Sequence, residues 1–360
     1  MTYLDYQATT PLAPEALSAM LPWLEHGHAN PHSPHREGRR ARAAVDHARG
    51  QVAALLPSGG TLAFTSGATE ALNWAIQGSR GPIVTIATEH AAVLETAAAT
   101  GRPLTVLPVG TDGLVDLDAA RAAIGPGTGL VAAMLVNNEI GVIQPIAALA
   151  GLAHGVGARM LCDAVQGYGR VPIPDSCDMI AISAHKVHGP KGVGALWLRD
   201  GVVPAPLLHG GGQEVPGRSG TLSPALCAGF GAAAALMASR RQEDTRHVEQ
   251  LWACAIAALG DGWTINGGVD QRYRGNLNVR RQGLDVARLM SDVRDVAFSA
   301  GSACASGSGR SSHVLRALGL SERDARASIR LGFGRYTDED ELCAALNALS
   351  TAARAQRVRA

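Results

Sequence analysis

The chain has 360 residues, of which 46% are hydrophobic and 18% are charged. This balance is typical of a folded globular protein and excludes a disordered one. The formal net charge of +1 is too small for the strong positive field that favours nucleic acid or an acidic membrane surface. We therefore expect a small-molecule substrate, and neither a nucleic acid nor a membrane as partner.

The length predicts one large domain and one smaller domain. Charged helices and a second set of strands begin near Thr245, so we place the large domain at residues 12–244. The small domain then comprises residues 1–11 and 245–360. The N-terminal segment lacks a basic region followed by an apolar core, and no apolar run is long enough to cross a bilayer. We expect a cytoplasmic protein.

Short aliphatic runs alternate with helical patterns through the predicted large domain. We expect strands at these runs, which are residues 82–86, 129–136, 160–162, 179–182 and 193–198. Strands separated by helices predict the α/β class, with a mostly parallel sheet covered by helices on both faces. The smaller C-terminal domain is predicted to be α+β.

Polar residues follow several of these predicted strands. His90, Asn138 and Asp163 each come at or soon after a strand end, as does the segment Ser183–Lys186. Ligands bind beyond the carboxyl ends of the strands in sheets of this type. These residues are therefore the first candidates for a functional site.

The segment Thr65–Glu70 precedes a helical stretch, Ala71–Ile76. Backbone amides and hydroxyl groups at a helix N-terminus favour a phosphate group, because the N–H groups are unpaired and the helix dipole is positive there. Taken alone, an ordinary Ser or Thr N-cap is the simpler interpretation.

Lys186 and Asp163 are charged residues at the ends of apolar strands. A Gly- and Pro-rich stretch, Gly189–Gly194, follows Lys186 and predicts a tight turn that excludes water. Most lysines are solvated, but a lysine in a pocket has a lowered pKa and can form a Schiff base with an aldehyde cofactor. Asp163 suits a protonated pyridine nitrogen; a helix N-cap remains an equally open interpretation.

The six cysteines show no Cys-x-x-Cys pair and no Cys/His spacing of a metal site, so no metal is expected. A chain this long does not need disulfides for stability, and most free cysteines are buried. Cys304 differs because it lies in Ser299–Arg310, a run of small residues that predicts an exposed, mobile loop. Arg310 and a charged cofactor would favour its thiolate; a Gly/Ser linker is the competing interpretation.

Taken together, these segments resemble the NifS/IscS-type cysteine desulfurases, a branch of the class V aminotransferase family with the fold type I of pyridoxal-phosphate-dependent transferases. The resemblance covers nearly the whole chain. The motifs that carry it, in chain order, are Tyr3–Pro11, Asn30–Pro31, Thr65–Glu70, Thr88–His90, Val136–Gly141, Asp163–Gln166, Ser183–Gly192, His209–Gly212, Arg218–Thr221, Ser299–Cys304 and Ser328–Arg330.

The resemblance implies a role for each matching residue. Lys186 would carry pyridoxal 5′-phosphate, His90 would stack on its ring and move protons, and Cys304 would accept the sulfur. Further cofactor contacts would come from Asp163 at the pyridine nitrogen, Gln166 at the phenolic oxygen, and Ala68, Thr69, Ser183 and His185 at the phosphate, with Thr221 supplied by the other subunit of a homodimer. Asn138 and Arg330 would bind the substrate carboxylate, with Asn30 close by, and Asn138 would also contact the cofactor.

The implied function is a transferase reaction that converts L-cysteine to L-alanine and leaves the sulfur as a persulfide on Cys304. The sulfur would pass to an acceptor protein, such as a scaffold for iron-sulfur cluster assembly, or to other thio-cofactor synthesis. The long Gly/Ser-rich form of the Cys304 loop matches the NifS/IscS group. The chain ends soon after a helix at about residues 341–350, which puts scaffold docking in doubt.

Two other functions compete with this one. Another class V enzyme, such as an aminotransferase or a selenocysteine lyase, would use the same pocket, but transamination needs no thiol in a loop. A binding protein that has kept the fold without activity is the second alternative. The retention of Lys186, Asp163 and His90 together argues against it.

Overall fold

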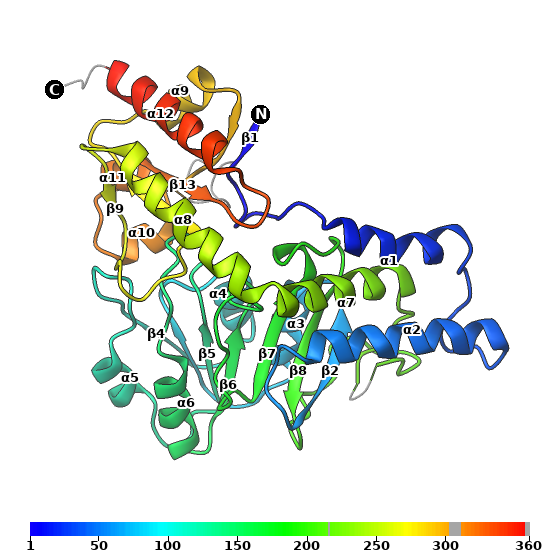
Figure 1. The fold of residues 1–360 in the computed structure, drawn as a ribbon. Coiled ribbons are helices and arrows are strands. Elements are labelled where there is room, and N and C mark those ends of the chain that lie inside the picture. The colour runs from blue at the N-terminus through cyan, green and yellow to red at the C-terminus, as the bar shows by residue number, and fades with distance from the viewer. Residues whose placement is uncertain (215–216, 302–310, 357–360) are drawn as a thin grey trace.

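The computed structural model describes residues 1–214, 217–301 and 311–356. A seven-stranded sheet forms the centre of the larger part of the molecule (Figure 1), with the strand order β2-β8-β7-β6-β5-β3-β4. Its strands are β2 (Gly60–Thr65), β3 (Ile83–Ile86), β4 (Leu104–Leu107), β5 (Leu130–Met134), β6 (Arg159–Asp163), β7 (Met179–Ser183) and β8 (Gly194–Arg199).

The central sheet is mostly parallel, as the sequence predicts. Strands β4, β3, β5, β6 and β7 pair in parallel, whereas β8 runs antiparallel between β7 and β2. The five predicted strands are confirmed as β3, β5, β6, β7 and β8. The sequence analysis did not single out β2 and β4, which lie at the two edges of the sheet.

Both faces of the central sheet are buried under helices. Successive strand residues belong to different core clusters: Leu161 packs with α3 and α4, and its neighbour Cys162 packs on the opposite face. This alternation explains why the strands read as continuous apolar runs. The helices of this part are α1 (Pro14–Glu25), α2 (Arg36–Ala53), α3 (Ala68–Gln77), α4 (Ala91–Ala99), α5 (Leu117–Ala123), α6 (Ile146–Gly155) and α7 (Pro224–Ser239).

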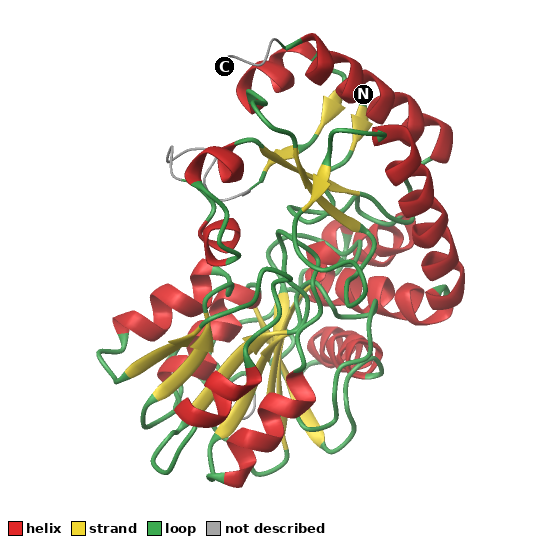
Figure 2. Cartoon of the chain, turned by 90° about the vertical axis from the view of Figure 1, so that its left-hand side faces the viewer, coloured by secondary structure: helices red, strands yellow, loops and turns green. Residues whose placement is uncertain are grey.

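A four-stranded antiparallel sheet forms a second, smaller layer, with the order β12-β13-β10-β9 (Figure 2). Its strands are β9 (Thr264–Ile265), β10 (Asn276–Arg280), β12 (Ser299–Ala300) and β13 (Ser328–Gly332). It packs with α8 (Arg241–Leu259) and α12 (Glu339–Ala355) around a core of its own. Shorter helices complete this part: α9 (Val286–Asp292), α10 (His313–Ala317) and α11 (Glu322–Arg326).

The N-terminal segment belongs to the smaller core. Strand β1 (Thr2–Tyr3) pairs in parallel with β11 (Val296–Ala297), and Leu4 is buried among residues of the small layer. The long helix α8 begins beside the end of α7 and continues into the small layer (Figure 1). We propose that the large and small domains meet at residue 245, which lies within α8.

The cysteines differ in part from the expectation. Cys162, Cys177 and Cys227 are buried free thiols, as expected. Cys254 on α8 and Cys343 on α12, however, form a disulfide with a Cα–Cα separation of 6.3 Å. The two residues are 89 positions apart, so no local spacing pattern predicted this disulfide.

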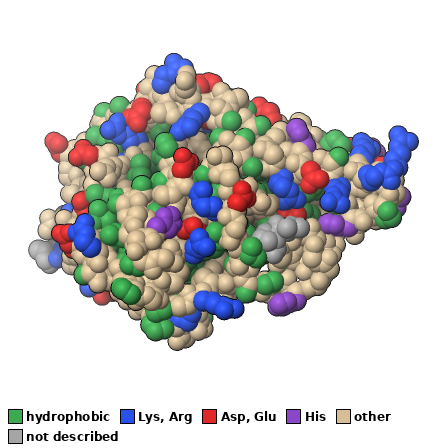
Figure 3. All heavy atoms as spheres, turned by 90° about the horizontal axis from the view of Figure 1, so that it is seen from below, with side chains coloured by type: hydrophobic (Ala, Val, Ile, Leu, Met, Phe, Trp, Pro, Cys, Tyr) green, Lys and Arg blue, Asp and Glu red, His purple; other side chains and the backbone are tan. Residues whose placement is uncertain are grey.

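Charged side chains of both signs are interspersed over the face seen in Figure 3, which fits the small net charge. Each helix within the described residues is too short or too polar to traverse a lipid bilayer. Within the same residues, no group of three or more His, Cys, Asp or Glu side chains is arranged as a metal site requires.

Candidate active site

A cavity of about 630 Å³ lies where the carboxyl ends of the central strands face the small sheet. Helix α3, the N-terminal segment and β13 also contribute to its walls. Most of the residues that the sequence analysis selected line this cavity, namely Ala68, Thr69, His90, Asn138, Asp163, Gln166, Ser183, His185, Lys186 and Arg330.

Lys186 ends a short 3-10 turn, Ala184–Lys186, that directly follows β7. Its Nζ donates hydrogen bonds to the carbonyl oxygens of Gln7, at 2.5 Å, and Ala8, at 2.8 Å. Burial, together with the positive charges of Arg330 and Arg170, lowers the pKa of Lys186 to about 8. The amine is therefore much more often neutral and nucleophilic near neutral pH than a solvated lysine.

Asp163 is the last residue of β6 and is buried. Its Oδ1 accepts a hydrogen bond from the backbone N–H of Val165 at 3.0 Å. Burial raises the pKa of the carboxyl, and this hydrogen bond and the nearby positive charges of His90 and Lys186 only partly offset that increase. A carboxylate lining a cavity in this environment favours a cationic partner, such as a protonated ring nitrogen.

His90 is the N-cap of α4. Its Nδ1 accepts a hydrogen bond from the backbone N–H of Ala92 at 3.1 Å, which assigns the proton of the neutral ring to Nε2. Burial lowers the pKa of His90, although Asp163 opposes the shift. The cavity is therefore lined by a neutral imidazole that can exchange a proton.

The first turn of α3 supplies an anion site at one end of the cavity. Gly67 is the N-cap of this ten-residue helix, and no described side chain caps it. A Cβ at Gly194 on β8 would lie 2.7 Å from the Cα of Gly67, so glycine at 194 permits this close approach. Unpaired amides at a helix N-terminus are the donor set that a phosphate requires.

His185 completes this end of the cavity. Its Nδ1 lies 3.1 Å from the hydroxyl oxygen of Thr9. Burial and the charges of Lys186 and Lys191 lower its pKa to about 4, so the ring is neutral near pH 7. Lys191 also lines the cavity and places a positive charge there. The sequence analysis assigned it no role.

Gln166 and Asn138 line the middle of the cavity. The Nε2 group of Gln166 donates to the carbonyl oxygen of Gln7 at 2.9 Å, and its Oε1 accepts from Arg170 at 3.3 Å. The carbonyl oxygen of Asn138 accepts from Arg330 at 3.1 Å and from Asn276 at 3.2 Å. Neighbouring residues thus fix the side chain of Gln166 and the backbone of Asn138.

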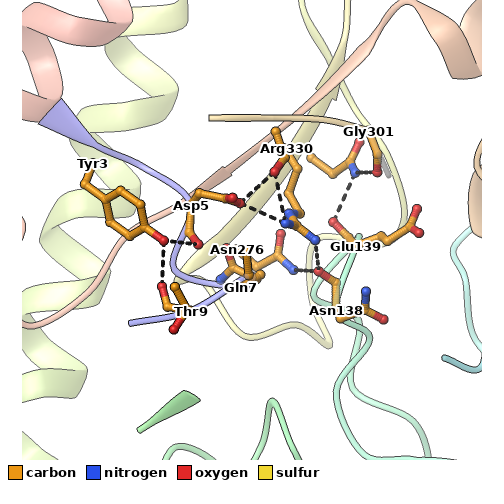
Figure 4. Close-up of polar contacts among 12 residues, drawn as sticks. Tyr3, Asp5, Gln7, Thr9, Asn138, Glu139, Asn276, Gly301 and Arg330 are labelled. Carbon is orange, nitrogen blue, oxygen red and sulfur yellow. Dashed lines mark hydrogen bonds and ion pairs between the residues drawn. The ribbon is translucent and has the colours of Figure 1, made fainter. Parts of the chain in front are cut away.

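Arg330 on β13 is held at the opposite wall by the contacts drawn in Figure 4. Its Nη2 donates to the carboxylate of Asp5 at 2.8 Å, and to the hydroxyl oxygen of Ser299 at 3.3 Å. The side chain is only 1% exposed. A guanidinium at the wall of a cavity is a suitable group for binding a carboxylate.

The N-terminal segment is the part of the site for which the sequence analysis proposed no individual residues. Gln7, Ala8 and Thr9 line the cavity, and Thr10 accepts and donates hydrogen bonds with the backbone around His185. The sequence did indicate that this segment is functional, because Tyr3–Pro11 is one of the motifs that support the family resemblance. Its backbone carbonyls, however, are not visible in a sequence pattern.

Glu89 is a second buried acid behind Asp163 that received no role. Its Oε1 accepts a hydrogen bond from the backbone N–H of Met134 at 2.6 Å. Burial and the charge of Asp163 raise its pKa well above the ordinary value. This shift favours the protonated, neutral form of Glu89, which does not line the cavity among the described residues, whereas Asp163 does.

Two of the selected residues lie away from the cavity of their own chain. Asn30 is exposed in the turn between α1 and α2, where its Oδ1 accepts from the backbone N–H of His32 at 2.9 Å. Thr221 is exposed just before α7. Neither is among the described residues that line the cavity. A third selected residue, Cys304, lies outside the described residues.

The donor set of the cavity fits pyridoxal phosphate. Unpaired amides at the start of α3 suit the phosphate, the buried carboxylate of Asp163 suits the pyridine nitrogen, and the amine of Lys186 suits the aldehyde. These three groups line one cavity. The fit rests on this arrangement of charge and hydrogen-bond donors.

Comparison with known proteins supports the same assignment. The family model described as aminotransferase class-V matches residues 2–344. A protein named cysteine desulfurase IscS from Rickettsia bellii is 42% identical and covers 94% of this chain and 88% of its own length. The curated relatives of the same name include one from Rickettsia conorii, which is 40% identical and covers 96% of this chain and 89% of its own.

Solved structures show the same architecture. A NifS-like protein from Rickettsia africae superposes with a TM-score of 0.90 at 28% identity, and covers 98% of this chain and 99% of its own. A structure described as SspA in complex with cysteine has a TM-score of 0.83 at 34% identity, and covers 94% of this chain and 100% of its own.

Proposed function

The chain belongs to the class-V aminotransferase family, and we propose that it is a pyridoxal-phosphate-dependent cysteine desulfurase. It converts L-cysteine to L-alanine and transfers the sulfur. The observation that most supports this function is the arrangement of Lys186, Asp163 and Arg330 around one cavity. Together these residues provide an amine, a buried carboxylate and a carboxylate-binding guanidinium.

The residues that hold the cofactor follow from the donor set. Lys186 would bond to the aldehyde carbon, Asp163 would pair with the ring nitrogen, and Gln166 would lie near the phenolic oxygen. Ala68 and Thr69 offer backbone amides at the start of α3 to the phosphate, assisted by Ser183 and His185. When bound, pyridoxal phosphate supplies an electron sink that weakens the Cα–H bond of an amino-acid substrate.

The residues of the chain then bind the substrate and move its proton. Arg330 and Asn138 bind the carboxylate of L-cysteine, which fixes the position of its Cα. The neutral amine of Lys186 accepts the α-proton, because its pKa of about 8 lies close to neutral pH. His90, with its proton on Nε2, also lines the cavity and takes part in returning a proton.

Cys304 accepts the sulfur in this proposal. Its thiolate attacks the sulfur atom of the substrate, a sulfur–sulfur bond forms, and the carbon–sulfur bond breaks to leave a persulfide on Cys304. Ser299 hydrogen-bonds to Arg330, and Cys304 is three positions beyond Gly301 in the sequence. Ser299, five positions before Cys304, therefore contacts the arginine that we propose binds the substrate carboxylate.

We infer a homodimer from two features. Thr221 and Asn30, the two residues that lie away from the cavity of their own chain, would contribute to the partner's site. In addition, Leu17, Leu21 and Leu24 follow one face of α1 and are 44%, 41% and 62% exposed. An exposed apolar stripe of this kind favours association with another protein surface.

The persulfide sulfur requires an acceptor. We infer a thiol-bearing protein, such as an iron-sulfur scaffold, and we place the reaction in the cytoplasm. A thiol acceptor balances the chemistry, because it takes the outer sulfur of the persulfide and restores the thiol of Cys304. A small-molecule thiol reductant would release the same sulfur as sulfide, so the transfer can be measured without the acceptor protein.

The test is a visible absorption spectrum of the purified protein before and after addition of L-cysteine, with alanine and sulfide measured in the presence of a thiol reductant. We expect a yellow protein whose spectrum changes on mixing, and equal amounts of alanine and sulfide. Lys186→Ala should lose both the colour and the turnover. A colourless wild-type protein that releases no alanine would exclude this function.

A further inference from the structure

Arg330 has a dedicated counter-ion, the carboxylate of Asp5. The Nη2–Oδ1 distance is 2.8 Å, and the ion pair joins residues 325 positions apart. The hydroxyl group of Ser299 donates to the same Oδ1 at 2.8 Å. Figure 4 shows the carboxylate of Asp5 directed at the guanidinium of Arg330. Among the described residues, Asp5 is the only acid within ion-pair distance of Arg330.

The backbone holds Asp5 in this place. Asp5 forms a parallel bridge with Gly332, two residues beyond Arg330 on β13. The N–H of Gly332 donates to the carbonyl oxygen of Leu4 at 2.8 Å. A Cβ at Gly332 would lie 2.8 Å from the backbone nitrogen of Tyr6, so the segment can approach this closely only because residue 332 is glycine.

Arg330 makes one further hydrogen bond through Nη1, and its Nε is left without a partner among the described residues. Nη1 donates to the carbonyl oxygen of Asn138 at 3.1 Å. An arginine that is 1% exposed needs a compensating charge. Asp5 and the Asn138 carbonyl therefore fix the plane of the guanidinium, while Arg330 also lines the cavity.

We propose that Asp5 is a positioning residue that orients Arg330 for the substrate carboxylate, and thereby sets the preference for an α-amino acid over an amine or ester. The inference rests on the proposed function of the cavity and adds a residue to it. Asp5 acts through Arg330 and touches neither the reacting carbon nor the sulfur. Its loss should weaken recognition of the carboxylate and leave the chemical step nearly unchanged.

Two substrates and four variants, one of them a control, test this role. L-Cysteine and L-cysteine methyl ester differ in the charge that Arg330 would bind. In Asp5→Asn, we expect KM for L-cysteine to rise about tenfold, a typical loss for one charge-assisted hydrogen bond, with kcat within about threefold. KM for the methyl ester should stay within about twofold. Asp5→Glu keeps the charge and should recover most of the affinity for L-cysteine.

Tyr3→Phe is the matched control. The Tyr3 hydroxyl donates to the carbonyl oxygens of Asp5, at 3.2 Å, and Thr9, at 2.9 Å, so this variant loosens the same segment without touching the Asp5 carboxylate. We expect the ratio of the two KM values to stay at the wild-type ratio. A general structural role for the segment would lower kcat/KM for both substrates in Tyr3→Phe and Asp5→Asn alike.

Ser299→Ala keeps the proposal testable if Asp5→Asn does not fold. It removes the hydroxyl that links Asp5 to Arg330 and changes no charge, so the KM ratio should move in the same direction by a smaller factor. An unchanged or inverted ratio in folded Asp5→Asn or Ser299→Ala would overturn the positioning role. Failure of wild-type protein to release alanine from L-cysteine would instead overturn the proposed function.

Discussion

The amine of Lys186 lies 2.5 Å from the carbonyl oxygen of Gln7, although 179 positions separate the two residues. The segment that contains Gln7 belongs to the smaller core through Leu4, whereas Lys186 follows a strand of the central sheet. The site is therefore assembled from both layers. Its chemistry depends on how the N-terminal segment passes over the carboxyl edge of the sheet.

The first prediction concerns the lowered pKa of Lys186, about 8. Because the neutral amine attacks the aldehyde, the rate at which apoprotein captures pyridoxal phosphate should rise with pH and level off above about 8. A solvated lysine would still gain rate up to about pH 10. Stopped-flow absorbance measures the rate.

A substitution of Arg170 tests whether its positive charge helps to lower the pKa of Lys186. Its charge is one of those that lower the pKa of Lys186, so Arg170→Gln should move the midpoint of the profile to higher pH. Arg170→Lys keeps a positive charge and should restore much of the shift. A midpoint that is equal in all three proteins would mean that this charge does not contribute.

The second prediction contrasts two buried acids. Asp163→Asn should lower kcat about 100-fold or more, because the ring nitrogen loses its anionic partner. Glu89→Gln should stay within about fivefold of wild type, because the raised pKa of Glu89 already keeps it neutral. Steady-state release of alanine measures both. Equal losses in the two variants would contradict the assignment of the charge to Asp163.

The raised pKa of Glu89 also predicts that the stability of the protein depends on pH. Its folded-state pKa is raised, so protonation favours the folded state, and this contribution is lost as pH rises above the unfolded value of about 4.3. The stability of wild type relative to Glu89→Gln should therefore fall as pH rises above about 5. Urea unfolding of both proteins across this range measures the difference, and parallel curves would argue against a buried neutral acid.

The third prediction tests a site shared between subunits. A heterodimer of a Lys186→Ala chain with a Thr221→Ala chain should contain one doubly impaired site and one intact site. Random reassociation of equal amounts should therefore recover about a quarter of wild-type activity, since about half of the dimers are mixed. No recovery despite heterodimers detected by native mass spectrometry would place Thr221 outside the partner's site.

The fourth prediction separates sulfur transfer from cofactor binding. Cys304→Ala should keep the yellow colour and still bind L-cysteine, because Cys304 is not among the groups proposed to hold the cofactor. Release of alanine and sulfide should fall about 100-fold or more, since a methyl group cannot attack the substrate sulfur. Wild-type rates in this variant would require another lyase or transaminase chemistry.

The fifth prediction concerns the disulfide between Cys254 and Cys343, which connects α8 to α12. The bridge closes a loop of 89 positions, so reducing it should lower the free energy of unfolding by about 2–4 kcal/mol. Cys254→Ser should melt at the temperature of the reduced wild type and should no longer respond to reductant. Thiol alkylation with mass spectrometry counts the free cysteines in each state.

Local patterns predicted the strands well where both faces are buried. The apolar runs of β3, β5, β6, β7 and β8 are long enough to stand out, because the side chains on them pack against helices on both faces. The edge strands β2 and β4 were not singled out. In β4 only Leu107 is buried, so its sequence is less distinctive.

The central α/β architecture and the residues that follow its strands could be predicted from the sequence, because apolar periodicity and strand-end position are local properties of the chain. Contacts between residues far apart in the sequence became known only from the tertiary structure. The pairing of Asp5 with Arg330, the carbonyls around Lys186 and the bridge between Cys254 and Cys343 join residues 89 to 325 positions apart. Such contacts depend on how the two layers pack, and no local pattern encodes that packing.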